Sequence, residues 1–158
     1  MNREEFIDKI DSKVKLIRNE KDFTQDKMAR IIGISKKTLV QVEKGRSSIG
    51  WMGAISVCSI FKDSEILQMT FGGDTQDIIR CLAFDNYEEN YNNLLSATMG
   101  GKIWWKEVEG NENFKIQVNI VSNHYRILDN KNRRISFSFD IDYIKKRYSE
   151  LSMGGGEI

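Results

Sequence analysis

The chain has 158 residues, of which 40% are apolar, and a formal net charge of +1 at pH 7. This apolar fraction can build a hydrophobic core, which argues against global disorder, and the length suits one ordinary domain or two small ones. No stretch approaches the roughly 20 apolar residues that span a bilayer. The charged N-terminus also lacks the apolar core of a signal peptide. We therefore expect a cytoplasmic protein without a membrane partner.

The charges are distributed unevenly along the chain. Residues 1–62 hold 13 Lys and Arg against 8 Asp and Glu, whereas the remainder holds 11 against 15. A basic N-terminal part beside an acidic C-terminal part indicates two functional regions.

Apolar residues recur every three or four positions through the first 71 residues, which predicts a series of helices. The second and third of these helices are short, and each is preceded by a hydroxyl residue that can cap it and followed by a glycine that can end it. The fourth is apolar nearly all round, so we expect it at the centre of the core. The predicted helices span residues 3–20, 25–32, 36–44, 50–61 and 64–70, in an all-α domain of residues 1–71.

The pattern changes after Phe71–Asp74, where two glycines mark a domain boundary. Apolar residues from Ile79 to Leu94, with Tyr87 and Tyr91 among them, predict a long helix, either continuous or interrupted near Asp85–Asn86. Beyond Gly100–Gly101, apolar and polar residues alternate as in half-buried strands, and short loops join them into an antiparallel β-meander. The sequence thus predicts an α+β fold. Its C-terminal domain covers residues 74–152, with strands at 102–108, 114–120, 125–128 and 134–140, a last helix at 142–151 and a disordered tail at 153–158.

Residues 24–45 resemble the helix-turn-helix of phage repressors and of bacterial XRE-type regulators. Several features match in one ungapped register, and the similarity extends over about residues 14–68. The matching features are Thr24–Gln25, Ala29, Gly33–Ile34–Ser35, Thr38–Leu39, and Glu43 two residues before Gly45.

This resemblance implies that the helix of residues 36–44 enters the major groove of duplex DNA. Lys36, Lys37 and Gln41 match the family's base-reading positions. Lysine can donate to guanine O6 and N7, and glutamine can pair with adenine. Gln25 matches a position that grips phosphate, while Lys44 and Arg46 are expected to contact the backbone. The predicted DNA-binding residues are Gln25, Lys36, Lys37, Thr38, Gln41, Lys44 and Arg46.

The resemblance also implies an ion pair between Arg18 and Glu43. We expect it to be largely buried and to hold the first helix to the recognition helix. The sequence departs from the family's usual pattern at Ile49, where proline is common, and at Asp22, where glycine is common. Aspartate tolerates left-handed backbone better than most residues, and neither position is one that faces DNA.

Residues 35–46 carry four cations against one anion. We therefore predict a sequence-specific transcriptional regulator that binds double-stranded DNA as a homodimer. The alternative is a protein-interaction module, antitoxin-like or an inhibitor, on a helix-turn-helix scaffold. The C-terminal domain could serve dimerisation, small-molecule sensing or docking of a protein effector. We rank dimerisation first because apolar strands and aromatic residues are plentiful there.

We predict no enzyme, cofactor, metal site or catalytic residue, because the sequence contains no phosphate-binding glycine loop and no nucleophile–base pairing. An enzyme would instead need a deep polar pocket in the C-terminal sheet. Cys58 and Cys81 lie in apolar surroundings and are expected to be buried thiols. His124, at a predicted turn, is expected to be a surface residue. Trp104 and Trp105 are expected to face opposite sides of a strand, one of them in the core.

Overall fold

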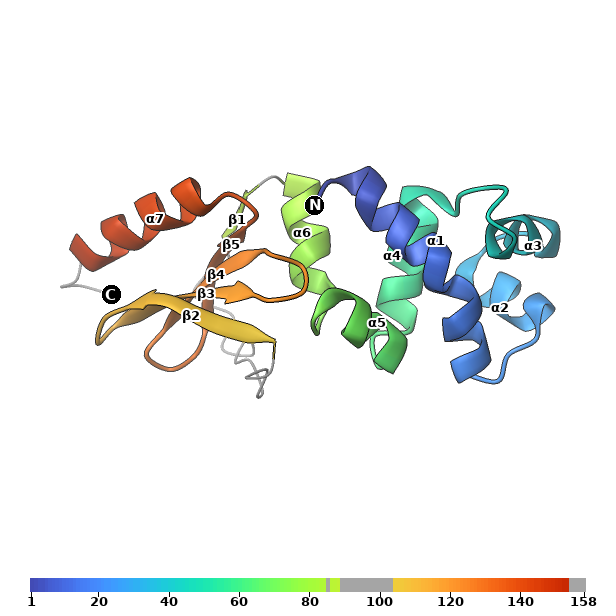
Figure 1. Ribbon diagram of the computed structural model, residues 1–158, viewed down its shortest axis with the longest axis horizontal. Coiled ribbons are helices and arrows are strands. Elements are labelled where there is room, and N and C mark those ends of the chain that lie inside the picture. The colour runs from blue at the N-terminus through green and yellow to red at the C-terminus, as the bar shows by residue number, and fades with distance from the viewer. Residues whose placement is uncertain (85, 89–103, 154–158) are drawn as a thin grey trace. The chain divides into compact units, whose positions relative to one another are not determined.

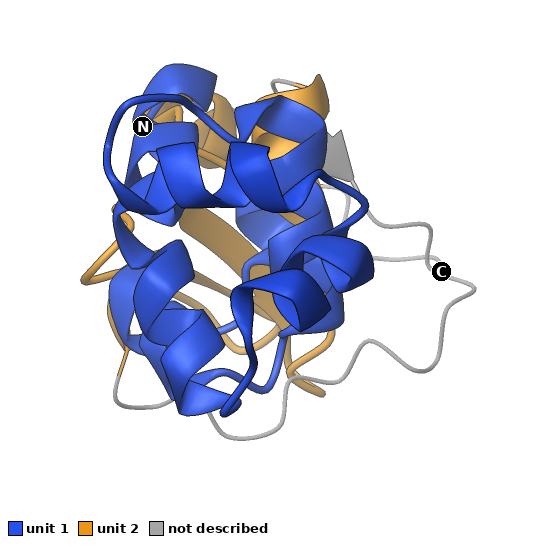
Figure 2. Ribbon diagram, turned by 90° about the vertical axis from the view of Figure 1, so that its right-hand side faces the viewer, with its two compact units in different colours: residues 1–79 blue, residues 80–158 orange. Residues whose placement is uncertain are grey.

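The computed structural model describes residues 1–84, 86–88 and 104–153. It forms two compact units, residues 1–79 and 80–158, which are coloured separately in Figure 2. The division lies within helix α6 (Gln76–Phe84), whereas the sequence placed it at Phe71–Asp74. The first unit therefore extends beyond the predicted boundary. The assignment of a separate task to each part of the chain stays a prediction.

The first unit begins with five helices, and each end lies within one residue of the sequence prediction (Figure 1). Local side chains explain several of these ends. Asn2 and Glu5 form a capping box before the first helix, and the Ser64 hydroxyl accepts a hydrogen bond from the Leu67 amide before the fifth. The helices are α1 (Arg3–Glu20), α2 (Gln25–Ile32), α3 (Lys36–Glu43), α4 (Gly50–Ile60) and α5 (Glu65–Phe71).

The core of this unit is centred on α1, which packs against α3, α4 and α5. Its apolar stripe, Phe6, Ile10, Val14 and Ile17, is fully buried. Each of these side chains contributes roughly 1.5–3 kcal/mol when it leaves water. Helix α1 thus forms the support on which the shorter helices are positioned.

Helix α4 is less enclosed than its apolar sequence predicts. It buries Ala54, Val57 and Cys58 on the side that faces its neighbours. Met52 and Ile60 are 71% and 46% exposed. The reason is that α4 packs against α1 and α2, and these two helices cover only part of its circumference.

The second unit contains a five-stranded antiparallel sheet in the order β1-β5-β4-β3-β2 and a final helix, α7 (Figure 1). The fold class is therefore α+β, as predicted, and consecutive strands β2 to β5 form the predicted meander. Two of the strand pairings contain a register shift, in β2–β3 and in β4–β5. The elements are β1 (Asn86–Glu88), β2 (Trp105–Gly110), β3 (Phe114–Asn119), β4 (Tyr125–Asp129), β5 (Arg134–Ser138) and α7 (Ile141–Met153).

Helix α7 covers one face of this sheet. It packs against β3, β4 and β5, and its Ile144 and Tyr148 join Ile116, Ile127 and Ile135 in one buried cluster. Ile116 and Ile127 are direct partners across the β3–β4 ladder. The alternation seen in the sequence of β3 therefore marks the face that packs under α7.

Strand β1 replaces part of the long helix predicted from Ile79 to Leu94. Helix α6 ends at Phe84, and Tyr87 pairs with Phe137 of β5. The backbone pairing at the sheet edge outweighs the helical spacing of the apolar residues, because local pattern is a weak determinant where tertiary pairing competes. Tyr91 and Leu94 lie outside the described residues. So does the predicted tail beyond Met153, which is itself the last residue of α7.

Candidate DNA interface

Helices α2 and α3 are joined by Gly33, Ile34 and Ser35 alone. Gly33 has a φ of 77°, a left-handed conformation that glycine adopts without the steric cost of a side chain. The Ile34 amide then donates to the Ala29 carbonyl at 3.0 Å. Ala29 is only 2% exposed, and α2 and α3 pack against each other. The three-residue joint therefore fixes the angle between the two helices.

Ser35 caps α3. Its hydroxyl oxygen accepts a hydrogen bond from the Thr38 amide at 3.0 Å, and it lies 2.8 Å from the Thr38 hydroxyl. The Thr38 side chain is thus engaged in the cap. Ser35, Lys36 and Lys37 are exposed, so the partial positive charge of the helix N-terminus faces solvent.

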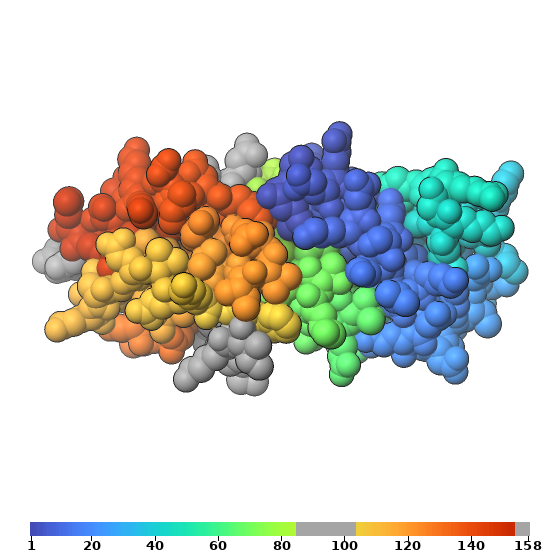
Figure 3. Space-filling model, viewed as in Figure 1, coloured from blue at the N-terminus to red at the C-terminus, as the bar shows by residue number. Residues whose placement is uncertain are grey.

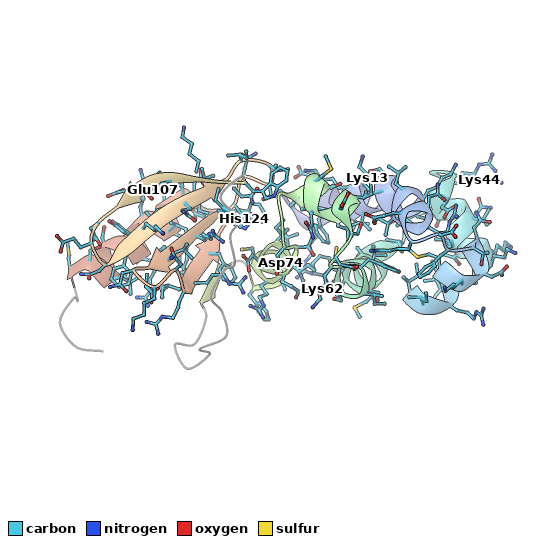
Figure 4. The ribbon with its side chains drawn as sticks, turned by 90° about the horizontal axis from the view of Figure 1, so that it is seen from below. Lys13, Lys44, Lys62, Asp74, Glu107 and His124 are labelled. Atoms are coloured by element: carbon cyan, nitrogen blue, oxygen red, sulfur yellow. The ribbon has the colours of Figure 1, made fainter. Side chains whose placement is uncertain are left out.

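The two faces of α3 differ sharply in polarity. Leu39 and Val42 are 0% and 2% exposed and anchor the helix in the core. The opposite side carries polar and cationic residues. The region of α3 lies at the surface of the unit in Figure 3, and Lys44 extends away from the ribbon in Figure 4. Every residue of the predicted DNA-binding set is exposed or half-exposed. These residues are Gln25, Lys36, Lys37, Thr38, Gln41, Lys44 and Arg46.

Lys36 differs from the other cations of this surface. Its ammonium lies 2.7 Å from the Asp26 carboxylate of α2. Lys37, Lys44 and Arg46 have no ion pair within the described parts of the chain. The sequence analysis did not single out Asp26. The signal that could have found it is the tight α2–α3 joint, which brings the first turn of each helix together.

Arg18, Glu43 and Gln25 form a network that connects α1, α3 and α2. Arg18 Nε and Nη2 donate to the two Glu43 carboxylate oxygens at 2.6 and 3.2 Å. Arg18 Nη1 also donates to the Phe23 carbonyl at 3.0 Å, before α2 begins. The Arg18 and Glu43 side chains are 14% and 4% exposed. The pair expected from the sequence is therefore present, bidentate and largely removed from solvent.

The network keeps both groups charged. Burial is the largest influence on Glu43 and opposes its ionisation, but hydrogen bonds from Arg18 and Gln25 and the positive charge nearby outweigh it and lower the pKa. The hydrogen bond to Glu43 is the main cause of the raised pKa of Arg18. A paired arginine and carboxylate at this depth are costly to separate.

Gln25 takes part in this network through its amide nitrogen, which donates to Glu43 Oε2 at 2.8 Å. A side-chain amide has two N–H donors, so the second remains for a phosphate oxygen. The phosphate contact expected of Gln25 stays a prediction. The observed bond adds that Gln25 is held in position by the ion pair beneath it.

His124 lies in the second unit and is 1% exposed, so the prediction of a surface histidine is wrong. Its ring packs edge-on against Trp105, and its Nδ1 is 2.7 Å from the Ser122 hydroxyl. The Asn119 side chain shapes the turn that directs His124 inward, because its Oδ1 accepts hydrogen bonds from the Val121 and Ser122 amides. Burial, and then the charge of Arg126, lowers the pKa of His124 to about 3.

The two tryptophans are also placed differently from the prediction. Trp104 precedes β2, and its carbonyl accepts the Ile120 amide at 2.8 Å, while Trp105 begins the strand. Both side chains are half-buried, so neither is a fully enclosed core residue. The Arg126 guanidinium lies 3.6 Å from the centre of the Trp105 ring, which is a close cation–π contact.

Among residues 1–84, 86–88 and 104–153, no cluster of three or more His, Cys, Asp or Glu could hold a metal ion. Cys58 and Cys81 are both buried, as expected, and burial raises the pKa of Cys58 to about 12. Over the same residues, no helix is both long and apolar enough to cross a membrane.

Residues 14–50 match the helix-turn-helix family of cro/C1 type. This segment, which contains the joint, α3 and the Arg18–Glu43 pair, is an XRE-type helix-turn-helix. At this general level the protein is a DNA-binding helix-turn-helix protein, and the matching family is not one of enzymes. Neither the curated proteins nor the solved structures contain a match to the chain.

Proposed function

We propose that the protein is a sequence-specific transcriptional regulator that reads the major groove of double-stranded DNA with α3. The observation that carries this proposal is the two-sided build of α3. Leu39 and Val42 fix the helix in the core, while its capped N-terminus and its polar side chains lie outside. A rigid helix with free donors along one side can lie in a groove and meet base edges.

The residues then divide by role. Lys36, Lys37 and Gln41 lie on the part of α3 that would face base edges. Lys44 and Arg46, in the loop after α3, would contact phosphates of any DNA sequence. Such contacts position the protein but do not discriminate between bases. Gln25 would add a phosphate contact from the start of α2.

We further propose that the regulator acts as a homodimer and that the second unit provides the dimer contact or an effector site. One short helix discriminates among few base pairs, and helix-turn-helix proteins gain specificity from two half-sites about one helical turn apart. The alternative, a protein-interaction module, does not account for the exposed cations of α3.

The test is selection of duplexes from a random-sequence pool with the purified full chain. We expect an enriched motif with two related half-sites. On the selected duplex, Lys37→Ala and Gln41→Ala should each cost roughly 1–3 kcal/mol of binding free energy and relax the base preference. Lys44→Ala should weaken all duplexes by a similar factor.

Lys62→Ala is the matched control, because Lys62 is exposed, lies beyond α4 and is outside the proposed interface. It should leave binding nearly unchanged. The proposal fails if no motif is enriched, or if Lys37→Ala and Lys62→Ala have the same effect. It also fails if affinity is insensitive to salt, since phosphate contacts release counterions.

A further inference from the structure

An acidic residue stands within the surface that would face DNA. Asp26 lies in the first turn of α2, and its carboxylate is 2.7 Å from the ammonium of Lys36, the first residue of α3. The two side chains are 59% and 56% exposed, respectively. The two side chains are therefore held together by their opposite charges across the α2–α3 joint and not by burial.

This arrangement has a cost that a DNA-binding surface could avoid. A carboxylate close to the phosphate backbone is repelled by it, and a paired lysine cannot release a counterion by contacting a phosphate. An exposed pair of this kind is weak enough to open when a better acceptor is presented.

We propose that Asp26 is a specificity-determining residue that restrains non-specific DNA binding by holding Lys36. On an arbitrary duplex, Lys36 stays with Asp26, and the exposed cations Lys37, Lys44 and Arg46 carry the phosphate contacts. At the correct site, a base-edge acceptor such as guanine O6 or N7 takes the ammonium from Asp26. This inference rests on the proposed function.

The test uses a duplex of mixed sequence, so it needs no knowledge of the target site. Binding of the full chain is measured across a range of salt concentrations for the parent and for Asp26→Asn. We expect the variant to bind several-fold more tightly. We also expect the slope of log K against log salt to steepen by about 0.9, the value for one added phosphate contact.

Two matched comparisons separate this mechanism from a simple change of net charge. Asp63→Asn removes the same charge and also opens an exposed ion pair, with Lys21 at 2.9 Å, but it lies outside α2 and α3. Its effect should be much smaller than that of Asp26→Asn. In a Lys36→Ala background, Asp26→Asn should retain only the gain from removing the carboxylate's own repulsion, and the added salt slope of about 0.9 should disappear.

The inference is overturned if Asp26→Asn and Asp63→Asn act alike, or if Asp26→Asn steepens the salt slope equally in the Lys36→Ala background. In both cases the parent still binds duplex DNA, so the proposed function stands. If neither the parent nor any variant binds the duplex, the proposed function fails and this inference fails with it.

Discussion

In the first unit, Lys37, Lys44 and Arg46 lie in solvent around α3, and one ion pair, Arg18–Glu43, is held below them. In the second unit, Arg126 is buried and contacts Trp105, and His124 is enclosed beside Ser122. The cations around α3 of the first unit therefore face outward, while several polar side chains of the second unit face inward.

The difference has a physical meaning. An exposed cation keeps its hydration and remains available to a partner, whereas a buried polar group must find its hydrogen bonds inside the fold. The first unit is thus built to present charge on a rigid support. The second unit uses its polar side chains to specify its own turns and strands. The predictions below test this contrast through the stability of each unit.

The largest effect is expected at the buried pair of the first unit. Glu43→Gln should lower the free energy of unfolding by roughly 3–5 kcal/mol, because it leaves the Arg18 charge without its partner. Hydrogen–deuterium exchange should show the loss in peptides of α1 and α3 and not in the sheet. Glu4→Gln, at an exposed position of α1, is the control and should leave exchange unchanged.

The pair also predicts a pH dependence. The folded state lowers the pKa of Glu43 below its ordinary value of 4.5, so the unfolded chain binds more protons as the pH falls. The contribution of Glu43 is complete above pH 4.5 and is lost as the pH drops through its folded pKa. If Glu43→Gln melts at the parent's temperature at neutral pH, the ion pair does not hold these helices together.

A smaller effect is expected at His124 in the second unit. Its pKa falls from 6.5 to about 3 on folding, so between these values the unfolded chain binds the extra proton. Stability should therefore fall by up to about 1.4 kcal/mol for each pH unit below 6.5. His124→Gln should remove this slope.

Denaturation followed by tryptophan fluorescence in a Trp51→Phe background isolates the second unit, because Trp104 and Trp105 are then the remaining tryptophans. Measurements between about pH 5 and about pH 7 avoid the range in which Glu43 titrates. A parent whose second unit keeps the same stability across this range would contradict the enclosed, neutral histidine.

The smallest effect is expected at the cap of α3. Ser35→Ala should cost about 1 kcal/mol, because the Thr38 amide loses its acceptor. Exchange should quicken in the first turn of α3 before it changes elsewhere. Ser47→Ala, in the exposed loop after α3, is the matched control. Equal exchange in the two variants would show that the cap does not hold the start of the helix.

The sequence predicts the first unit well because its signals are local. The stripe from Phe6 to Ile17, the caps Thr24 and Ser35 and the glycine that ends α2 each act within a few residues of their own helix. Asp22 adopts a positive φ of 51°, which also agrees with the sequence analysis.

The second unit is less predictable because long-range pairing decides it. Strand β1 forms because its backbone pairs with β5, some fifty residues further along the chain. His124 is drawn inward by the turn around Asn119 and by the Trp105 ring. The contact between Asp26 and Lys36 likewise depends on how two helices meet. Whether the predicted DNA-binding residues contact DNA stays a prediction.

Under the proposed function, the joint of Gly33, Ile34 and Ser35 limits how the DNA target of this protein can change. An α-helix turns by about 100° per residue, so one inserted residue at the start of α3 would swing its later side chains off the groove or pull Leu39 out of the core. Insertions or deletions in this segment would therefore disrupt either the core or the DNA contact. New targets can arise only by exchanging side chains on a frame of constant length.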